Sequence, residues 1–572
     1  ISTWHYDSLG RVTRAVCDGK SYEYIYDAYG NLKEKRSNGK RLVSYTHDRA
    51  GQITEIRDPA GVCTRYEYDI LGRRSRIFND DGLEVRYGYD ALNRIRHIRY
   101  GNGVETAYTY DGDGNVRTLE TRAGENVLLS FAYRYDGNGN RTAKTGMQAT
   151  LGGITSEITA GNNALDLSYA YDVRGQLLEE RRNGASVCYA YDKAGNRIRK
   201  TDVQGEIRYL YNEKNQLIAE ESPADRKQFS YDRQGGIIEE KNAAGIRLFS
   251  YNSRHQQTRV ETETGSVQEN RYDAEGLRFE LLENGRRTSF VYHDGELLQE
   301  EGREEQGTSY HLGAGMEAFR RGQELSYYHR DEQLSTTFIT GRHGDVLNSY
   351  QYDAFGVPLE TTEQLNNRIR YTGQQYDELT EQYYLRARYY NPVAGRFMQE
   401  DVYQGDGLNL YAYCGNNPVV YDDPSGYAST SIGKACPPQG KISESVDESG
   451  RDIVPDKGFS SFKDLKTHLD SPGDGKVWHH IVEQSQITGS GFSSEQVNNI
   501  NNVIAIPHGK GSIHAKISGY YSSKQFFTGG KTVRQWLAGQ DFKTQFDFGM
   551  NLLKEYGDVI PSSKGWIFRT FE

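Results

Sequence analysis

The sequence is short of aliphatic residues and proline. With its 44 tyrosines exchanged for its 62 glycines, the apolar share of the 572 residues is roughly 39 %, against about 45 to 50 % in ordinary globular domains. Thick aliphatic cores are therefore excluded. The 12 prolines and the 12 % aromatic content also exclude a collagen or a disordered chain. We expect several folded parts with thin, aromatic-rich walls.

Cysteines and long apolar runs are scarce as well. The five cysteines are widely scattered and form no CxxC pair, so neither a disulfide framework nor a Cys-ligated zinc is indicated. No apolar run approaches the ~20 residues of a membrane span. The net charge of -10 argues against a nucleic-acid coat along the whole chain. Because Ile1 starts no charged and apolar leader, we expect a fragment or processed piece.

A repeat of about twenty residues fills most of the chain. Its marker is the second tyrosine of a Tyr-x-Tyr-Asp unit, as in Tyr108 and Tyr110, with His47 standing in once. Alternate tyrosines place two rings on one face of a strand, and the Asp-x-x-Gly that follows is a turn sequence. Each repeat is therefore predicted to be one β-hairpin, and residues 1–360 one long antiparallel sheet.

A sheet of that length must curl, because strand twist accumulates. The predicted fold class is mainly β, a long spiralling antiparallel β-sheet that forms a hollow shell around a polar, water-filled cavity. A small α+β domain is expected at the C-terminal end. A solid β-solenoid or a propeller with blades of ~40 residues is the alternative.

The Tyr-Asp hairpins resemble the YD repeats of Rhs proteins, teneurins and insecticidal toxin-complex proteins, which wind into a hollow cocoon. Residues 361–427 have a different texture and resemble the Rhs core-associated segment. The matching pieces are YLRARYY at 384–390, GRF at 395–397, NLY at 409–411, NNP at 416–418 and DPSG at 423–426. Together the two resemblances cover about three quarters of the chain.

The resemblance implies that residues 361–427 plug the shell and act as an intramolecular aspartyl protease. Asp401 and Asp423 match the catalytic pair, and the cut would fall between Tyr427 and Ala428. One ionised carboxylate can activate water while a protonated neighbour polarises the scissile carbonyl.

Other features of this segment leave an alternative open. Val402 follows Asp401 where the family has Pro, and Tyr427 stands where it has Leu. Asp406 and Asp422 are weaker catalytic candidates. Read without the resemblance, Asp-Pro and Asn-Asn-Pro are only turn formers.

Beyond Tyr427 the tyrosine period stops. Residues 428–475 begin with a stretch rich in Ser, Gly and Pro, and we expect a linker or toxin entry region there. Residues 476–572 are predicted to be a separate domain, with helices from about Ser494, from near Ser512 and along the apolar stripe that starts at Phe542. This domain has ten Lys and Arg against seven Asp and Glu, an excess that suits a nucleic-acid substrate.

Three pieces of this last domain carry a second resemblance. VWHHIVEQ at 477–484, NNVIAIP at 501–507 and IHAKISGYYS at 513–522 resemble the HNH and endonuclease VII superfamily, in particular the Trp-His-His toxin nucleases. The resemblance implies a metal-dependent endonuclease for DNA or RNA with a divalent metal, Mg or Zn. The implied roles are His480 as general base, Asn502 as the residue that orients the His480 loop, His479 and His514 as metal ligands, His508 as a further ligand and Glu483 as an accessory group. Taken singly, His508 and His468 are interpreted as ordinary surface or core histidines.

These expectations combine into a polymorphic Rhs-type toxin used in interbacterial competition. The shell would encapsulate the nuclease, self-cleavage would release it, and the secreted or cell-surface protein would deliver it into the cytoplasm of a target cell. The expected partners are a nucleic-acid substrate, a cognate immunity protein and a secretion or delivery machinery. The alternative is a structural or adhesive YD-repeat surface protein without nuclease activity.

Overall fold

The computed structural model divides into two compact units, Ile1–Lys441 and Ile442–Glu572. It describes residues 2–149, 164–302, 306–402, 409–431, 459–469, 471–472, 475–490, 492–509, 512–524, 531–538, 540, 542–554, 556–562 and 565–570. Within these ranges no helix is both long and apolar enough to span a membrane.

The described part of the first unit holds a 34-stranded sheet in which each strand pairs antiparallel with the next along the chain. The first seventeen strands are β1 (Thr3–Tyr6), β2 (Val12–Cys17), β3 (Lys20–Tyr26), β4 (Leu32–Ser37), β5 (Lys40–His47), β6 (Ile53–Arg57), β7 (Cys63–Tyr68), β8 (Arg74–Phe78), β9 (Glu84–Tyr89), β10 (Ile95–Tyr100), β11 (Val104–Tyr110), β12 (Val116–Ala123), β13 (Asn126–Tyr135), β14 (Arg141–Gln148), β15 (Ala164–Tyr171), β16 (Leu177–Arg182) and β17 (Ala185–Tyr191). The next seventeen are β18 (Arg197–Asp202), β19 (Gly205–Tyr211), β20 (Leu217–Glu221), β21 (Arg226–Tyr231), β22 (Ile237–Asn242), β23 (Gly245–Tyr251), β24 (Gln257–Glu261), β25 (Val267–Tyr272), β26 (Arg278–Glu283), β27 (Arg286–His293), β28 (Glu296–Glu301), β29 (Thr308–Leu312), β30 (Met316–Arg321), β31 (Glu324–Arg330), β32 (Thr336–Thr340), β33 (Val346–Tyr352) and β34 (Pro358–Glu363).

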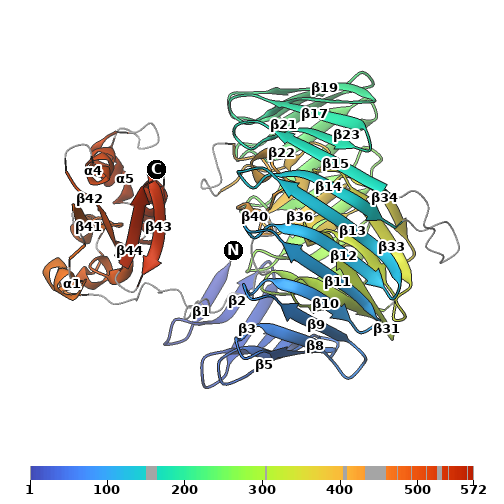
Figure 1. Cartoon of the computed structure of the whole chain (residues 1–572), viewed down its shortest axis with the longest axis horizontal. Helices are drawn as coiled ribbons and strands as arrows, with labels where there is room; N and C mark the ends of the chain where they lie inside the picture. Colours follow the sequence, from blue (N-terminus) through green and yellow to red (C-terminus); the bar gives the residue numbers. More distant parts are fainter. Residues whose placement is uncertain are drawn as a thin grey trace. The chain divides into compact units, whose positions relative to one another are not determined.

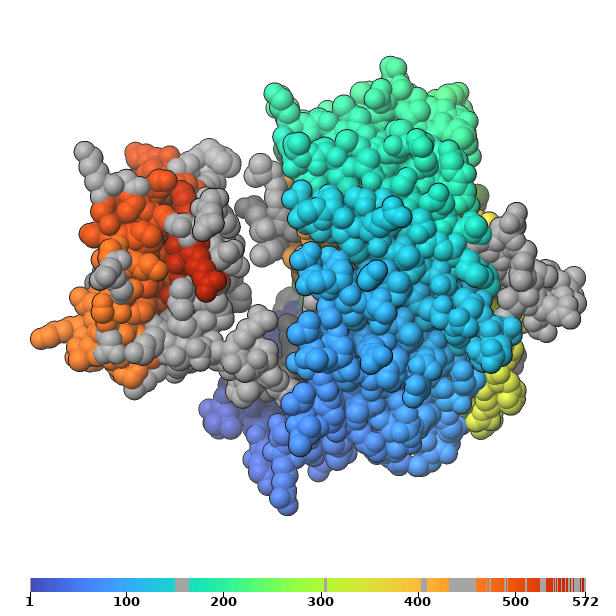
Figure 2. Space-filling model, viewed as in Figure 1, coloured from blue at the N-terminus to red at the C-terminus, as the bar shows by residue number. Residues whose placement is uncertain are grey.

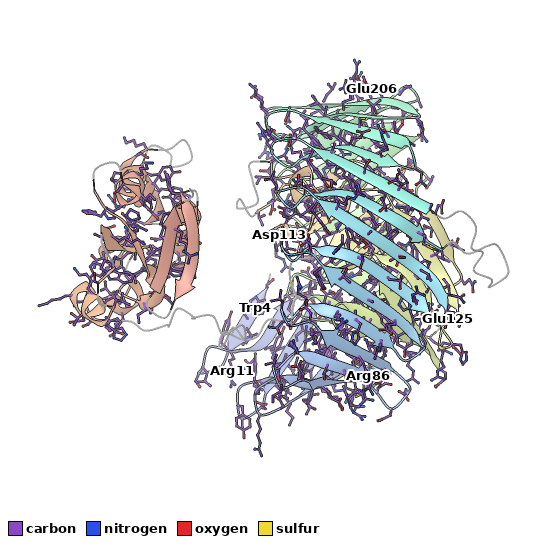
Figure 3. All side chains as sticks on the ribbon, in the orientation of Figure 1. Trp4, Arg11, Arg86, Asp113, Glu125 and Glu206 are labelled. Atoms are coloured by element: carbon purple, nitrogen blue, oxygen red, sulfur yellow. The ribbon has the colours of Figure 1, made fainter. Side chains whose placement is uncertain are left out.

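The turn of each repeat is built by its aspartate. In the turn after β11, Asp111 Oδ1 accepts hydrogen bonds from the N–H groups of Asp113 (3.0 Å) and Asn115 (2.9 Å). Gly114 takes a φ of +88°, which a residue with a Cβ rarely adopts. Asp113 and Glu125, in the turns before and after β12, mark the two opposite ends of the strands (Figure 3). The predicted hairpin repeat and the mainly β class are confirmed.

The second tyrosine of the repeat fastens each hairpin to the one before it. Tyr110 donates its hydroxyl to the Ile95 carbonyl (2.7 Å), and Tyr89 donates to the Arg74 carbonyl (2.6 Å). In each case the acceptor is the first residue of the preceding return strand. The same bond is made by Tyr26, Tyr68, Tyr135, Tyr171, Tyr191, Tyr211, Tyr231, Tyr251, Tyr272 and Tyr352. We call this series of hydrogen bonds the tyrosine ladder. Sequence reasoning assigned the rings to packing and did not predict these bonds.

Removing one rung should destabilise the shell modestly. Tyr110→Phe keeps the ring but removes the hydroxyl donor to the buried Ile95, so we expect a loss of about 1 kcal/mol in the free energy of unfolding. Denaturation by urea measures this loss. Tyr29→Phe is the matched control, because Tyr29 is 93 % exposed; equal effects of the two changes would contradict the role of the ladder.

The sheet curls until strands far apart in the sequence meet. Tyr100 on β10 packs its ring edge-on against His329 on β31, with centroids 4.7 Å apart, and Gln148 on β14 donates to the Tyr350 carbonyl on β33 (2.7 Å). We call the two stretches of sheet that meet in this way its arms. In Figure 1 the cyan strands β12–β14 belong to one arm and the yellow strands β33 and β34 to the other. Figure 2 shows the outer surface passing from blue to green along the repeats.

Side chains fill the contact between the two arms. One hydrophobic cluster takes members from residues 43–167 and from residues 281–369. Between these arms, aromatic and aliphatic packing therefore stands where the sequence predicts a polar, water-filled interior. The reason is that the inward tyrosines of both arms interdigitate instead of facing water.

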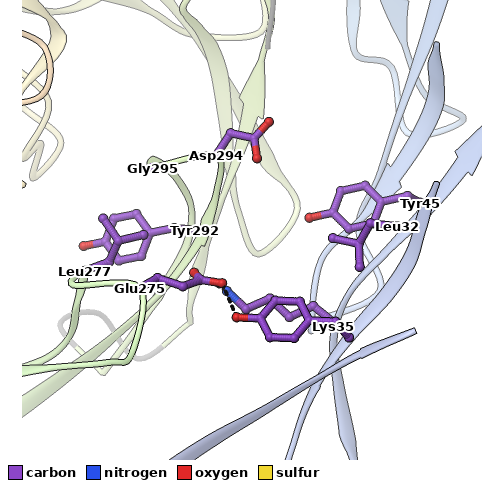
Figure 4. A pocket seen from close by; sticks show the side chains of 9 residues that line it. Leu32, Lys35, Tyr45, Glu275, Leu277, Tyr292, Asp294 and Gly295 are labelled. Carbon is purple, nitrogen blue, oxygen red and sulfur yellow. Dashed lines mark hydrogen bonds and ion pairs between the residues drawn. The ribbon is translucent and has the colours of Figure 1, made fainter. Parts of the chain in front are cut away.

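A small cavity remains where the first repeats meet β25–β28 (Figure 4). Its volume is about 300 Å³, much smaller than a protein domain. We call the contact between the first repeats and β25–β28 the seam. Two side chains of the first repeats reach across this seam to Glu275: Lys35 Nζ lies 2.6 Å from Oε2, and the Tyr24 hydroxyl donates to Oε1 at 2.5 Å. Tyr45 lies against His293 in the same seam, with its hydroxyl 3.2 Å from Nδ1.

The segment after β34 packs against the inner edge of the shell. Its strands are β35 (Gln375–Asp377), β36 (Gln382–Leu385), β37 (Arg388–Asn391) and β38 (Arg396–Phe397), which form one sheet, and β39 (Tyr421–Asp422) paired with β40 (Thr430–Ser431). Short 3-10 turns are η1 (Tyr371–Gly373) and η2 (Cys414–Asn416). Its side chains bond to the Asp-x-x-Gly turns, as Asn416 does to the Gly195 carbonyl (2.8 Å) and Tyr411 to the Gly235 carbonyl (2.9 Å).

The second unit contains a sheet with helices on both faces. Its elements are α1 (Phe462–Leu469), β41 (Lys476–His480), α2 (Gln486–Gly489), α3 (Ser494–Val497), η3 (Ile500–Asn502), β42 (Val503–Pro507), α4 (Ile513–Ser522), α5 (Val533–Leu537), α6 (Phe542–Lys554), β43 (Gly557–Ser562) and β44 (Gly565–Thr570), with sheet order β41-β42-β44-β43. The clusters place α1 against one face and α4–α6 against the other. Helix α1 lies inside the stretch 428–475 expected as a linker, because Leu465 and Leu469 pack on Val503.

Candidate functional site

The loop between β39 and β40, residues 423–429, is wrapped around one carboxylate. We call it the cleavage loop. Asp423 Oδ1 accepts hydrogen bonds from the N–H groups of Gly426 (2.8 Å), Tyr427 (3.1 Å) and Ala428 (3.2 Å). The nitrogen of the Tyr427–Ala428 peptide, where the sequence places the cut, therefore lies beside this carboxylate.

Asp401 and Asp423 meet at one guanidinium group. Arg388 Nη2 lies 2.7 Å from Asp401 Oδ2 and 3.4 Å from Asp423 Oδ2. The two carboxylate side chains are 3 % and 1 % exposed, so their charges need a buried counter-cation. Arg388 also donates through Nε to the Gly426 carbonyl. Sequence reasoning gave Arg388 no role, although it stands in the YLRARYY piece and a buried acidic pair is itself a signal that a cation must lie near.

The weaker candidates are placed differently. Asp422 lies on β39, where its Oδ1 accepts a hydrogen bond from Thr430 Oγ1 (2.6 Å). Burial raises the pKa of Asp422 to about 6, and the adjacent charge of Asp423 adds to the increase. Asp422 therefore keeps its proton to a higher pH than an ordinary aspartate does. Asp406 lies outside the residues that the structure describes.

In the second unit, β41 sends its paired histidines to opposite faces of the sheet, because neighbouring strand residues alternate. His480 faces α1, where its ring centroid is 4.2 Å from that of Phe462. His479 faces α4, with its ring 5.2 Å from the ring of His514. The two members of the His-His pair therefore have different surroundings.

His479, His508 and His514 form a row of rings. His514 is half-buried and contacts both others, with its centroid 5.2 Å from that of His479 and 5.0 Å from that of the exposed His508. Burial lowers the pKa of His479 to about 3, and the His514 and His480 rings add to the decrease. Burial also lowers the pKa of His514. Both imidazoles are neutral near pH 7.

His480 is held by a side-chain network. Its Nε2 lies 3.2 Å from Asn498 Oδ1, which also accepts a hydrogen bond from Gln484 (3.1 Å). Since that oxygen is an acceptor in both bonds, the His480 proton is assigned to Nε2, which leaves Nδ1 as the free base. Burial lowers the pKa of His480 to about 4, against the smaller opposing effect of the Asn498 bond.

Asn502 ties the chain after β41 in place. Its Oδ1 accepts from the Val482 N–H (2.8 Å), and its Nδ2 donates to the Val482 carbonyl (3.0 Å). These bonds hold the residues that follow His480. The sequence analysis assigns Asn502 the role of orienting this loop. Glu483 forms a two-pronged ion pair with Arg534 on α5, at 2.6 and 2.7 Å, and so contacts this cation instead of the histidine row.

The histidine row suits a divalent metal ion by its donors. Neutral imidazole is the ligating form, and rings bound to one ion through nitrogens at ~2 Å have centroids about 5 Å apart. As placed, however, no group of three His, Cys, Asp or Glu side chains in the described ranges is arranged to hold a metal ion. The rings of His479, His508 and His514 would have to turn toward a common point to do so.

Acid should destabilise the second unit. His479 and His480 have pKa values of about 3 and 4 in the folded chain, below the ordinary 6.5 of an unfolded histidine. Their contribution is complete above pH ~6.5 and is lost as the pH falls toward ~4, because the unfolded chain then binds the extra protons. Urea unfolding of residues 428–572 at several pH values should show this decrease, and a rise in stability on acidification would contradict it.

A continuous sheet of Tyr-Asp hairpins with a packed core-associated segment defines a YD-repeat shell protein. The chain belongs to the teneurin YD-shell family, whose model matches residues 35–133 and 147–419.

Several characterised proteins are similar to parts of this chain. The tRNA3(Ser)-specific nuclease WapA of Bacillus spizizenii is 40 % identical over 177 residues, which are 27 % of this chain and 7 % of that protein. The double-stranded DNA deaminase toxin A of Burkholderia cenocepacia is 30 % identical over 169 residues, 28 % of this chain and 12 % of that protein. The chain thus spans about 7 % of the length of the WapA relatives it matches.

Among solved structures, the TcdB2-TccC3 complex is 16 % identical to this chain. The likeness covers 74 % of this chain and 28 % of that one, with a TM-score of 0.42.

Proposed function

We propose that this chain is part of an Rhs-type toxin whose second unit is a nuclease. The observation that carries the proposal is the site around β41, where three histidine rings lie in a row, His480 is a buried neutral base and Asn502 fixes the following loop. Relatives named as tRNA nucleases support RNA, and tRNA first, as the substrate to test. The deaminase toxin matches a similar share of this chain as the nucleases do, so similarity alone does not distinguish nuclease from deaminase chemistry. The proposal of a nuclease therefore depends on the residues around β41.

Within this proposal the side chains divide the work. His480, whose pKa of about 4 keeps the ring neutral near pH 7, takes a proton from the attacking water or hydroxyl. Because His480 is buried on the α1 face of β41, opposite the histidine row, this role requires its ring to reach the water from the end of the strand. His479, His508 and His514 would hold a divalent metal ion, Mg or Zn, once their rings turn toward a common point, and the bound ion would neutralise charge on the phosphate. Glu483 acts indirectly, since its ion pair anchors α5 beside the loop that follows His480.

We further propose that the cleavage loop cuts itself between Tyr427 and Ala428. Water attacks the Tyr427 carbonyl carbon, the carbon–nitrogen bond breaks, and the proton released by water is taken up by the Asp401 and Asp423 pair. Asp423, whose Oδ1 lies 3.2 Å from the Ala428 nitrogen, returns a proton to the leaving amine.

The remaining proposals follow from a toxin role. The YD-repeat shell carries the nuclease, and the protein is secreted or displayed at the cell surface and delivers that domain to a target-cell cytoplasm. A cognate immunity protein protects the producing cell. Because residues 476–572 carry a positive excess, an acidic immunity surface would complement them.

Purified residues 428–572 test the nuclease directly. The fragment is incubated with plasmid, total RNA and tRNA, with and without EDTA, beside the same fragment carrying His514→Ala. We expect cleavage by the unaltered fragment, loss of cleavage with EDTA and weaker cleavage with the substitution. If the unaltered fragment cuts none of these substrates with any divalent metal, the nuclease proposal fails and a structural or adhesive surface role takes its place.

A further inference from the structure

The cleavage loop is docked on a single tight turn. Three consecutive carbonyls of the loop accept hydrogen bonds from three consecutive residues that run from the turn after β36 to the first residue of β37: Pro424 from the Arg386 guanidinium, Ser425 from the Ala387 N–H (3.2 Å) and Gly426 from the Arg388 guanidinium. A Cβ at Gly426 would come within 2.4 Å of the Leu385 carbonyl oxygen. Such close contact fixes the path of the loop up to Tyr427.

Arg386 differs from its two neighbours because it also reaches the shell. Its Nε donates to the Gly295 carbonyl (2.7 Å), and its Nη2 pairs with Glu296 Oε1 (2.5 Å). Gly295 lies in the turn that joins β27 to β28, and Glu296 is the first residue of β28. One guanidinium thus bridges a shell hairpin and the cleavage loop, a task suited to the rigid fork of arginine.

The turn between β27 and β28 also lies at the seam, the contact between the first repeats and β25–β28. Asp294 and Gly295 line the 300 Å³ cavity together with Tyr24 and Tyr45 of the first repeats. His293, at the end of β27, contacts Tyr45 across that seam. The position of the β27–β28 turn therefore depends on closure of the first repeats onto β25–β28.

We propose that Arg386 is a positioning residue for self-cleavage and makes the reaction depend on closure of the shell. Arg386 touches none of the reacting atoms, but it holds the Pro424 carbonyl, and through it the Tyr427–Ala428 peptide, only when the β27–β28 turn is in place. An opened shell leaves the Tyr427–Ala428 peptide displaced from the Asp401 and Asp423 pair, so the toxin segment is cut free after closure and not before. This inference rests on the proposed self-cleavage.

A cleavage time course on the full chain tests the proposal. The chain is made by cell-free translation with a short radioactive pulse, and the first-order rate of cleavage is followed as Arg386→Ala, Arg386→Lys or Glu296→Gln. We expect Arg386→Ala to slow cleavage on the order of 10²-fold, the cost of a displaced reacting group. Lys should restore part of the rate, and Glu296→Gln should have a smaller effect. Arg259→Ala, which removes an exposed ion pair elsewhere in the sheet, should leave the rate unchanged.

Two further readouts separate positioning from loss of fold. The shape of the pH–rate profile should be the same for Arg386→Ala and the unaltered chain, because the reacting carboxylates are retained. In a chain blocked by Asp401→Asn, adding Arg386→Ala should speed hydrogen exchange at the Tyr427 and Ala428 amides while the β27–β28 amides stay protected.

The outcomes are distinguishable. An unaltered cleavage rate with Arg386→Ala, or unchanged exchange at Tyr427 and Ala428, overturns the role of Arg386 and leaves self-cleavage standing. An unaltered chain that stays whole overturns the proposed self-cleavage, and with it the claim that Arg386 controls that reaction.

Discussion

Asp423→Asn is expected to leave the chain whole, whereas the unaltered chain separates between Tyr427 and Ala428. The asparagine side chain still offers an Oδ1 acceptor to the Gly426, Tyr427 and Ala428 amides, so the loop keeps its path. What it lacks is the carboxyl that exchanges a proton. Loss of a general acid or base costs about 10²- to 10⁴-fold in rate.

Mass spectrometry of the purified chain measures the result, because it identifies both the cut position and the intact mass. Asp113→Asn is the matched control, since Asp113 is an exposed acid at the tip of a shell turn. Efficient cutting of the Asp423→Asn chain at Tyr427 would remove Asp423 from the mechanism. Cutting at another bond would leave the carboxylate pair without its assigned substrate.

The hairpin repeat could be predicted because its chemistry is local. The aspartate accepts hydrogen bonds from amides two and four residues ahead, and the glycine four positions after the marker tyrosine takes the positive φ. Each repeat of about twenty residues therefore determines its own turn. The contact between the arms could not be predicted in the same way. It joins residues about 200 to 250 positions apart, such as Tyr45 and His293, and no period in the sequence announces which repeats will meet.

The candidate sites show the same division. Asp401 and Asp423 were chosen by resemblance, and the structure places both beside Arg388, which the text of the motif does not reveal. The split of His479 from His480 follows from strand alternation alone, but it required knowing that Trp-His-His lies in a strand.

His480→Ala is expected to abolish nucleic-acid cleavage by residues 428–572, whereas His514→Ala is expected to weaken metal binding and activity together. Neutral His480, held by Asn498 on the α1 face of β41, supplies the proton acceptor; His514 is the central ring of the histidine row on the other face. We expect a fall of about 10²- to 10⁴-fold for His480→Ala, with metal affinity unchanged.

Rates on tRNA and metal affinities by calorimetry, measured on the same preparations, separate the two roles. Excess Mg or Zn should rescue part of the His514→Ala activity and none of the His480→Ala activity, because added metal can refill a weakened site but cannot replace a base. His468→Ala is the matched control, since that ring packs on Phe459 away from the row. Full activity of His480→Ala would remove His480 as the general base and make His479 and His514, whose imidazoles are neutral near pH 7, the next candidates.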